Sequence, residues 1–287
     1  MKLSKILVPV DFSQQAAGAV QHAAALARHF GAELTLLHVN PILVPAVTAP
    51  LEFSGPIDTG WITELEVQAR KKLETFHSAE LGLLNVRRAV VTGDPAGRIV
   101  EFADREKPEL IVMPTHGYGP FRRFLLGSIT AKVLHDVACP VWTGAHIQES
   151  YGQNTFPSSW KWIGRVMCAI DPATAGPPLM WARDIASEFG ADLVVLHAVP
   201  ELEPKDPAAT GAAQATRCVQ CLMRNLSVAG EILIEEGDPA KVVQAAALRR
   251  NADLVVIGRS PHQGASGRLR TNAYSIVRDS PCPVVSV

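Results

Sequence analysis

The chain of 287 residues repeats itself, and this repeat restricts its fold more than any other feature. Four blocks of the first half are ILVPVDFS, ALARHFGAELTLLHVNP, VVTGDPAGRIVEFADREKPELIVMPTHG and VLHDVACPV. The second half answers in the same order with VMCAIDPA, DIASEFGADLVVLHAVPE, LIEEGDPAKVVQAAALRRNADLVVIGRS and IVRDSPCPVVSV. A period far above that of solenoid repeats indicates two duplicated domains. We expect them at residues 1–146 and 161–287, joined by a polar linker, 147–160, that is rich in serine.

Within each copy, short apolar runs alternate with longer helical patterns. Examples in the first copy are Ile6–Val10, Leu34–Val39, Leu110–Met113 and Val141–Thr143. Continuous apolar runs of this length suit strands that are buried on both faces, and their alternation with helices favours a parallel sheet. Each copy is therefore predicted to be a doubly wound, Rossmann-like α/β domain.

Turn and cap residues mark where the helices begin and end. Gly31 and Gly190 stand where the first helix of each copy should stop. In GDPAG and GDPAK, Asp94 and Asp238 are predicted N-caps, with a proline at the first helical position. His38 and His197 occupy matching positions near the ends of second strands, so a shared structural role is favoured over a metal site.

Composition restricts the class of partner. With 27 basic and 28 acidic residues, the net charge of −1 gives no global reason to bind nucleic acid or an anionic membrane. Five scattered cysteines do not form a disulfide framework, and no run suggests a membrane span or a leader. A cytoplasmic protein is expected. The Cys218 and Cys221 pair, with no second ligand pair, is interpreted as structural or incidental.

The stretch MPTHGYGPFRRFLLGS, residues 113–128, is the strongest candidate for a binding loop. Ligands of open α/β sheets bind outside the carboxyl ends of the strands. Gly127 and Ser128 stand at a predicted helix start, where free N–H groups and the helix dipole favour phosphate.

At these residues the chain resembles the universal stress protein family, and the resemblance covers both halves. The family's nucleotide-binding motif is G-x2-G-x9-G-[S/T]; Gly117, Gly127 and Ser128 fit it, with Pro114 in place of the first glycine. The resemblance implies two tandem domains with five parallel strands each, and a site for ATP or a related adenine nucleotide, with magnesium as an optional counter-ion. The implied contacts are Pro9, Val10, Asp11 and Val39 for adenine, Met113 and Gly117 for ribose, and Gly127, Ser128, Ile129 and Thr130 for phosphate. His116 is a further candidate, either as a donor to ribose or phosphate or as a donor to the backbone of the loop.

Two departures from the motif bear on function. Proline at position 114 removes one N–H donor but suits the extended end of a strand, so a weakened site is expected rather than a lost one. In the second copy, Arg270 and Thr271 align with Gly127 and Ser128, so poor nucleotide binding or none is expected there.

Three functions follow as hypotheses. The leading one is a stress protein whose first domain binds an adenine nucleotide as a regulatory ligand. The alternatives are a nucleotide-free interaction protein and a slow ATP hydrolase in which Asp11, Ser128 or Thr130 holds the metal-bound triphosphate, although no complete catalytic motif is present. The strands Val141–Thr143 and Val284–Val287 are expected to pair the domains internally and to be a candidate homodimer contact. The proline-rich segment Pro41–Trp61 is interpreted as a lid or a partner surface.

Overall fold

The computed structural model describes residues 1–41, 60–115, 126–144, 163–200, 209–259 and 268–287, with the backbone alone at 61–62, 209–210 and 268–271. None of the described helices is long and apolar enough to cross a bilayer. The linker, most of the segment Pro41–Trp61, and the loop residues His116 and Gly117 lie outside the described residues.

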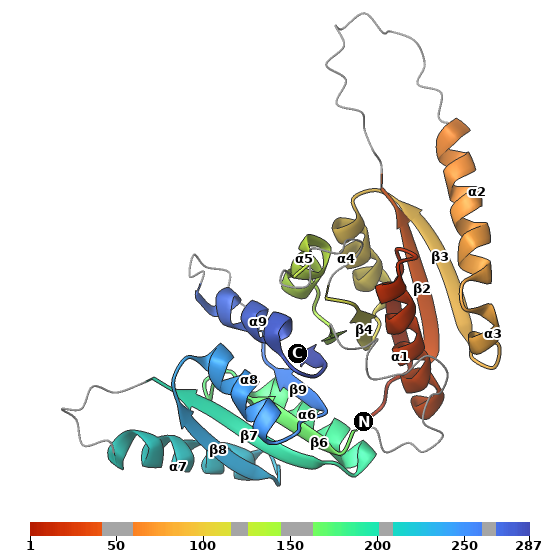
Figure 1. Cartoon of the computed structure of the whole chain (residues 1–287). Coiled ribbons are helices and arrows are strands. Elements are labelled where there is room, and N and C mark those ends of the chain that lie inside the picture. Colours follow the sequence, from red (N-terminus) through yellow and green to blue (C-terminus); the bar gives the residue numbers. More distant parts are fainter. Residues whose placement is uncertain (42–59, 116–125, 145–162, 201–208, 260–267) are drawn as a thin grey trace, which may run out of the picture.

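The first half of the chain alternates strands and helices, as predicted. Its strands are β1 (Lys5–Pro9), β2 (Glu33–Asn40), β3 (Val86–Thr92), β4 (Leu110–Met113) and β5 (Val141–Thr143). Its helices are α1 (Gln14–Phe30), α2 (Gly60–Thr75), α3 (Ser78–Leu81), α4 (Pro95–Glu106) and α5 (Ser128–Asp136). These elements run from red to light green in Figure 1.

Within its described residues, the second half repeats this order without a counterpart of the short α3. Its strands are β6 (Arg165–Ala169), β7 (Asp192–Val199), β8 (Glu231–Glu236), β9 (Leu254–Ile257) and β10 (Val284–Ser286). Its helices are α6 (Gly176–Phe189), α7 (Ala209–Asn225), α8 (Pro239–Arg249) and α9 (Arg268–Asp279). The two halves lie side by side in Figure 1.

All ten strands form one sheet in the order β3-β2-β1-β4-β5-β10-β9-β6-β7-β8. Each half contributes five parallel strands, and β5 pairs with β10 antiparallel, with Trp142 opposite Val285. The predicted internal pairing of the two halves is therefore confirmed. Both strands have neighbours on either side, so neither has a free edge for a second chain. Edge-to-edge pairing of these strands with a second chain is therefore excluded, while a homodimer stays a prediction.

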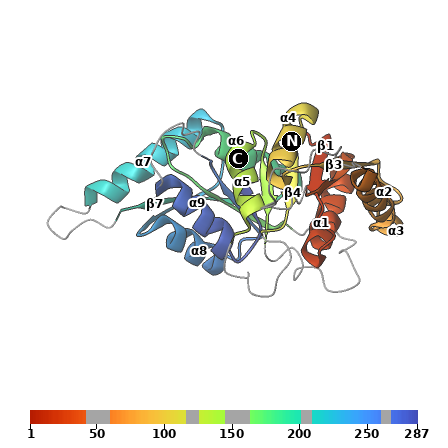
Figure 2. The same cartoon turned by 90° about the horizontal axis from the view of Figure 1, so that it is seen from above.

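Helices cover both faces of this sheet, and each face has its own apolar core. One core contains Val20 of α1, Leu73 of α2 and Ile185 of α6. The other contains Phe102 of α4, Val133 of α5 and Val243 of α8. Both cores extend through the two halves of the chain, so the halves share their interior. Figure 2, seen from above, shows α5 and α9 next to each other in the middle of the molecule.

The predicted caps explain where the helices begin and end. Asp94 accepts a hydrogen bond from the N–H of Gly97, and Asp238 accepts one from Lys241, each with proline at the start of its helix. Gly31 and Gly190 end α1 and α6 with φ of 65° and 64°, which glycine adopts without steric cost. These predictions are confirmed.

Candidate functional site

The carboxyl ends of the first-half strands bring the predicted adenine residues together. Pro9 lies level with Leu37 in the register of β1 and β2, and the register of β1 with β4, extended by two residues, places Met113 beside Pro9. Val39 and Met113 belong to the core that faces α4 and α5. Pro9, Val39 and Met113 therefore lie on the same face of the sheet as α5.

Val10 supports the carboxyl end of β1, and its N–H and its carbonyl are both hydrogen-bonded. Its N–H donates to the carbonyl of Leu37 at 2.8 Å, and its carbonyl accepts from Nδ1 of His38 at 2.7 Å. The matching His197 makes the same contact with the carbonyl of Ile170 at 3.0 Å. The shared structural role predicted for the two histidines is confirmed. Val10 thus supports the strand end through its backbone, and its contact with adenine stays a prediction.

The turn after β1 holds an exposed carboxylate in a strained loop. Asp11 is exposed, and its Oδ1 accepts a hydrogen bond from the N–H of Ser13 at 2.9 Å. Ser13 then caps α1 by accepting from Ala16. Between them, Phe12 has φ of 64°, a left-handed conformation that costs a residue with a side chain about 1–2 kcal/mol. The Phe12 ring contacts the rings of His38 and Phe76, which compensate for this strain.

Asn40 is a buried polar residue at the end of β2 that sequence reasoning did not single out. Its Oδ1 lies 3.1 Å from Nε2 of His38, and its Nδ2 has no acceptor among the residues that the structure describes. Since Nδ1 of His38 already donates to Val10, rotating the amide by 180° would let Nδ2 donate to a neutral His38. No local sequence pattern marks a buried asparagine at this position.

The start of α5 offers three backbone donors in one place. The N-cap Gly127 donates its own N–H to the carbonyl of Thr115 at 2.8 Å. The N–H groups of Ser128, Ile129 and Thr130 are the first three of the helix and have no acceptor among the described residues. Ser128 and Ile129 are exposed. The positive end of the helix dipole adds to these donors, so this end of α5 can bind an anion such as phosphate.

Side chains secure this helix start. Thr130 is buried, and its hydroxyl donates to the carbonyl of Pro114 at 3.0 Å. Lys132, one turn later, places its Nζ 3.2 Å from Oδ2 of Asp94. Hydrogen bonds from the N–H of Gly97 and then from Lys132 lower the pKa of Asp94. Thr130 therefore fixes the loop, and the ion pair of Lys132 with Asp94 links α5 to the start of α4.

In the residues that the structure describes, the second half differs from this arrangement in two local respects. Pro172 replaces Phe12, and because proline fixes φ near −65° it cannot adopt the left-handed conformation. The chain instead turns through Asp171 and Thr174, and α6 begins five residues after Asp171, whereas α1 begins three after Asp11. At the other end, α9 already begins at Arg268, so Thr271 lies inside the helix and not at its free start.

Other sequence candidates do not form a site in the described structure. Cys218 and Cys221 are exposed on α7, and no group of three or more histidine, cysteine or acidic residues able to hold a metal occurs within the described ranges. Cys282 is buried and Cys139 is half-buried; burial raises the pKa of each thiol to about 11.

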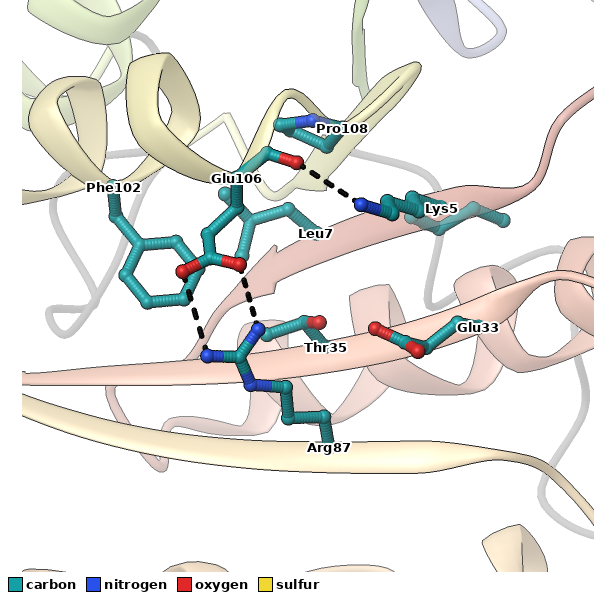
Figure 3. Close-up of a pocket in the computed structure, with 9 residues that line it drawn as sticks. Lys5, Leu7, Glu33, Thr35, Arg87, Phe102, Glu106 and Pro108 are labelled. Carbon is teal, nitrogen blue, oxygen red and sulfur yellow. Dashed lines mark hydrogen bonds and ion pairs between the residues drawn. The ribbon is translucent and has the colours of Figure 1, made fainter.

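A small cavity of about 20 Å³ lies at the amino ends of the first-half strands, opposite to the carboxyl ends that carry the candidate site. Figure 3 shows Lys5, Glu33, Arg87 and Glu106 around it, with Arg87 and Glu106 directly paired. This volume suits about one water molecule. The cavity is therefore separate from the candidate anion site.

The comparisons agree with this architecture. The model of the universal stress protein family matches residues 2–143 and 163–287. A universal stress protein of Mycolicibacterium smegmatis is 28% identical over 301 aligned positions, which cover 98% of this chain and 96% of that protein. A crystal structure of a universal stress protein from Archaeoglobus fulgidus has the same fold, with a TM-score of 0.69, 23% identity and coverage of 99% and 96% of the two chains. Another universal stress protein has been solved in complex with cAMP; it is 21% identical, spans 50% of this chain and 97% of its own, and has a TM-score of 0.35.

Proposed function

Because the chain belongs to the universal stress protein family, with two tandem domains in one sheet, we propose that its N-terminal domain binds ATP or a related adenine nucleotide as a regulatory ligand. The C-terminal domain serves mainly as a packing partner in this proposal. Adenine lies beside Pro9, Asp11 and Val39, and the phosphates lie at the start of α5.

The observation that carries the proposal is the set of unused donors at α5. Three consecutive N–H groups, at Ser128, Ile129 and Thr130, lack acceptors within the described structure, and the helix dipole favours an anion there. The strand ends that would hold the base lie on the same face of the sheet. The arrangement supports binding; a magnesium ion, when present, would be held by the phosphates and by the exposed carboxylate of Asp11.

Pro114 is compatible with this site. Met113 ends β4 in the extended conformation that a residue before proline prefers, and the carbonyl of Pro114 accepts from Thr130. The missing N–H at Pro114 removes at most one donor. That loss corresponds to about 1 kcal/mol, or roughly a five- to tenfold lower affinity.

A substitution at Gly127 tests the proposal. Gly127 has φ of −61°, which any residue adopts, so Gly127→Arg fills the approach to the donors without straining the backbone. We expect calorimetry with ATP to show binding to the native chain and no measurable binding to Gly127→Arg. Mass spectrometry of molecules released from freshly purified protein should show an adenine nucleotide in the first preparation alone.

Gly176 provides the matched control. It begins α6 in the other domain, and an added Cβ there meets nothing within 4 Å. Gly176→Arg should bind ATP as the native chain does. If the native chain releases no nucleotide and binds no added ATP, the nucleotide function is wrong and a nucleotide-free interaction protein becomes the better hypothesis.

A further inference from the structure

Arg259 connects the second domain to the helix that carries the candidate phosphate site. It follows β9 at the position that Thr115 occupies after β4. Its Nη1 donates to the carbonyls of Leu134 at 3.0 Å and Val137 at 2.9 Å, and its Nη2 donates to the carbonyl of Cys139 at 2.6 Å. One guanidinium therefore holds the last turn of α5 and the chain after it.

The surroundings of Arg259 are those expected of a cation at the C-terminal end of a helix. No carboxylate lies within ion-pair distance of it among the described residues, and burial lowers its pKa from the usual arginine value. The negative end of the α5 dipole and three carbonyls take the place of a counter-ion. On the same helix, the hydroxyl of Tyr274 in α9 donates to the carbonyl of Ala131 at 3.0 Å. Among the described residues, Arg259 and Tyr274 thus hydrogen-bond the second domain to α5.

The two ends of α5 have different partners. Its first turn carries the free donors of Ser128, Ile129 and Thr130, and its last turn is held by Arg259. A helix of nine residues is about 13 Å long and moves largely as one body. A shift at one end is therefore transmitted to the other.

We propose that Arg259 is a positioning residue that couples phosphate binding in the first domain to the packing of the two domains. This inference rests on the proposed nucleotide function. Arg259 fixes α5 in the position that binds phosphate, and bound phosphate in turn strengthens the contact of Arg259 with the last turn. The strand end that would bind a ligand in the second domain is used to hold the first domain instead.

The test compares Arg259→Met with Arg250→Met in the full chain. Arg250 also lies in the second domain and pairs with Glu231, but it makes no contact with α5. We expect Arg259→Met to weaken ATP binding by about fivefold or more, and Arg250→Met to change it by less than about twofold. Arg259→Lys, which keeps the charge but loses the planar fork, should give an intermediate affinity.

Hydrogen exchange provides the readout that a purely structural role would not change. In the native chain, ATP should slow amide exchange in the last turn of α5 and at Arg259, as well as at Ser128. In Arg259→Met, the slowing should be confined to the first turn of α5. Tyr274→Phe, which removes the hydroxyl alone, provides a milder variant should Arg259→Met fail to fold, and should weaken the same transmission.

Each other outcome contradicts the inference in a distinct way. If Arg259→Met lowers the melting temperature but binds ATP as tightly as the native chain, Arg259 only stabilises the fold. Unchanged exchange at Arg259 when ATP binds the native chain also overturns the coupling. If the native chain itself binds no ATP, the proposed function fails first and the coupling fails with it.

Discussion

His22 shows how one buried residue makes stability depend on pH. It lies in α1 with 1% of its surface exposed, and its ring centroid is 4.8 Å from that of Trp142. Burial lowers the pKa of His22 from 6.5 to about 3. Between these values the unfolded chain binds a proton that the folded chain does not. The contribution of His22 to stability is therefore fully present above about pH 6.5 and is lost as the pH falls toward 3.

The prediction concerns the slope of this dependence. Below pH 6.5, His22 should lower the free energy of unfolding by up to about 1.4 kcal/mol per pH unit. His22→Leu should flatten the pH dependence of urea unfolding between pH 6.5 and 4. Equal slopes in the native chain and His22→Leu would contradict this prediction.

Residues with a local role could be predicted from the sequence, and residues with a distant partner could not. Asp94 and Gly31 act on backbone groups within a few positions, so their patterns are readable. The left-handed Phe12 goes against the preference of an aromatic residue, and contacts with His38 and Phe76 stabilise it. Arg259 bonds to carbonyls more than a hundred positions away, and nothing near it in the sequence marks this.

At the scale of elements, the two domains use the same ion pair with its charges exchanged. Arg87 of β3 pairs with Glu106 at the end of α4, with Nη1 and Oε2 2.7 Å apart. At the matching positions, Glu231 of β8 pairs with Arg250 after α8, with Oε1 and Nη2 2.6 Å apart. The hydrogen bond from Arg87, and then that from Arg105, lowers the pKa of Glu106. In both domains an ion pair therefore joins the start of this strand to the end of this helix, but the positive and negative residues are exchanged.

This exchange predicts the outcome of a double substitution. Arg87→Glu alone places a carboxylate against Glu106, so it should lower the midpoint of thermal unfolding. Glu106→Arg alone should do the same by facing Arg87 and Arg105. The double variant, which copies the arrangement of the second domain, should recover most of the loss. A double variant no better than the sum of the two single variants would show that the pair does not interact in solution.

The order of elements was predictable, but the start of α9 was not. Apolar runs and caps indicated the strands and most helices in both halves. Aligning the halves placed Arg270 and Thr271 at a helix start, whereas α9 begins at Arg268. Gly267 directly precedes this start, three positions before the residue that aligns with Gly127. The shape of the candidate site thus depends on a shift of two or three residues in where the helix begins. Helix ends are the feature that sequence patterns define least well.

At the scale of the molecule, Trp142 joins the two halves. It lies in β5, is fully buried, and contacts the ring of His22 in α1 and that of Trp181 in α6, at a centroid distance of 6.2 Å for the second. Near the same boundary, Nε2 of His29 lies 3.1 Å from Oε1 of Glu188. Because the cores are shared, we expect both domains to unfold in one transition.

Trp142→Ala should therefore destabilise both domains at once, by about 3–5 kcal/mol. Hydrogen exchange during urea unfolding can follow peptides from β2 and β7 separately, and both should lose protection at the same, lower urea concentration. Leu248→Ala, at a side chain that is 58% exposed, should have little effect on either. Separate transitions for β2 and β7 in the native chain would contradict a shared core.

Because β5 pairs with β10 within one chain, the pairing of the two domains does not depend on the concentration of the protein. Two separate subunits joined by such short strands would dissociate on dilution, whereas tethered halves meet at an effective concentration on the order of millimolar. A cell with few copies of this chain would then hold it in the same paired form as a cell with many. Its paired state would not depend on the number of copies in the cell. A change in the fraction of chains that hold a nucleotide would then reflect the nucleotide concentration and not the amount of protein.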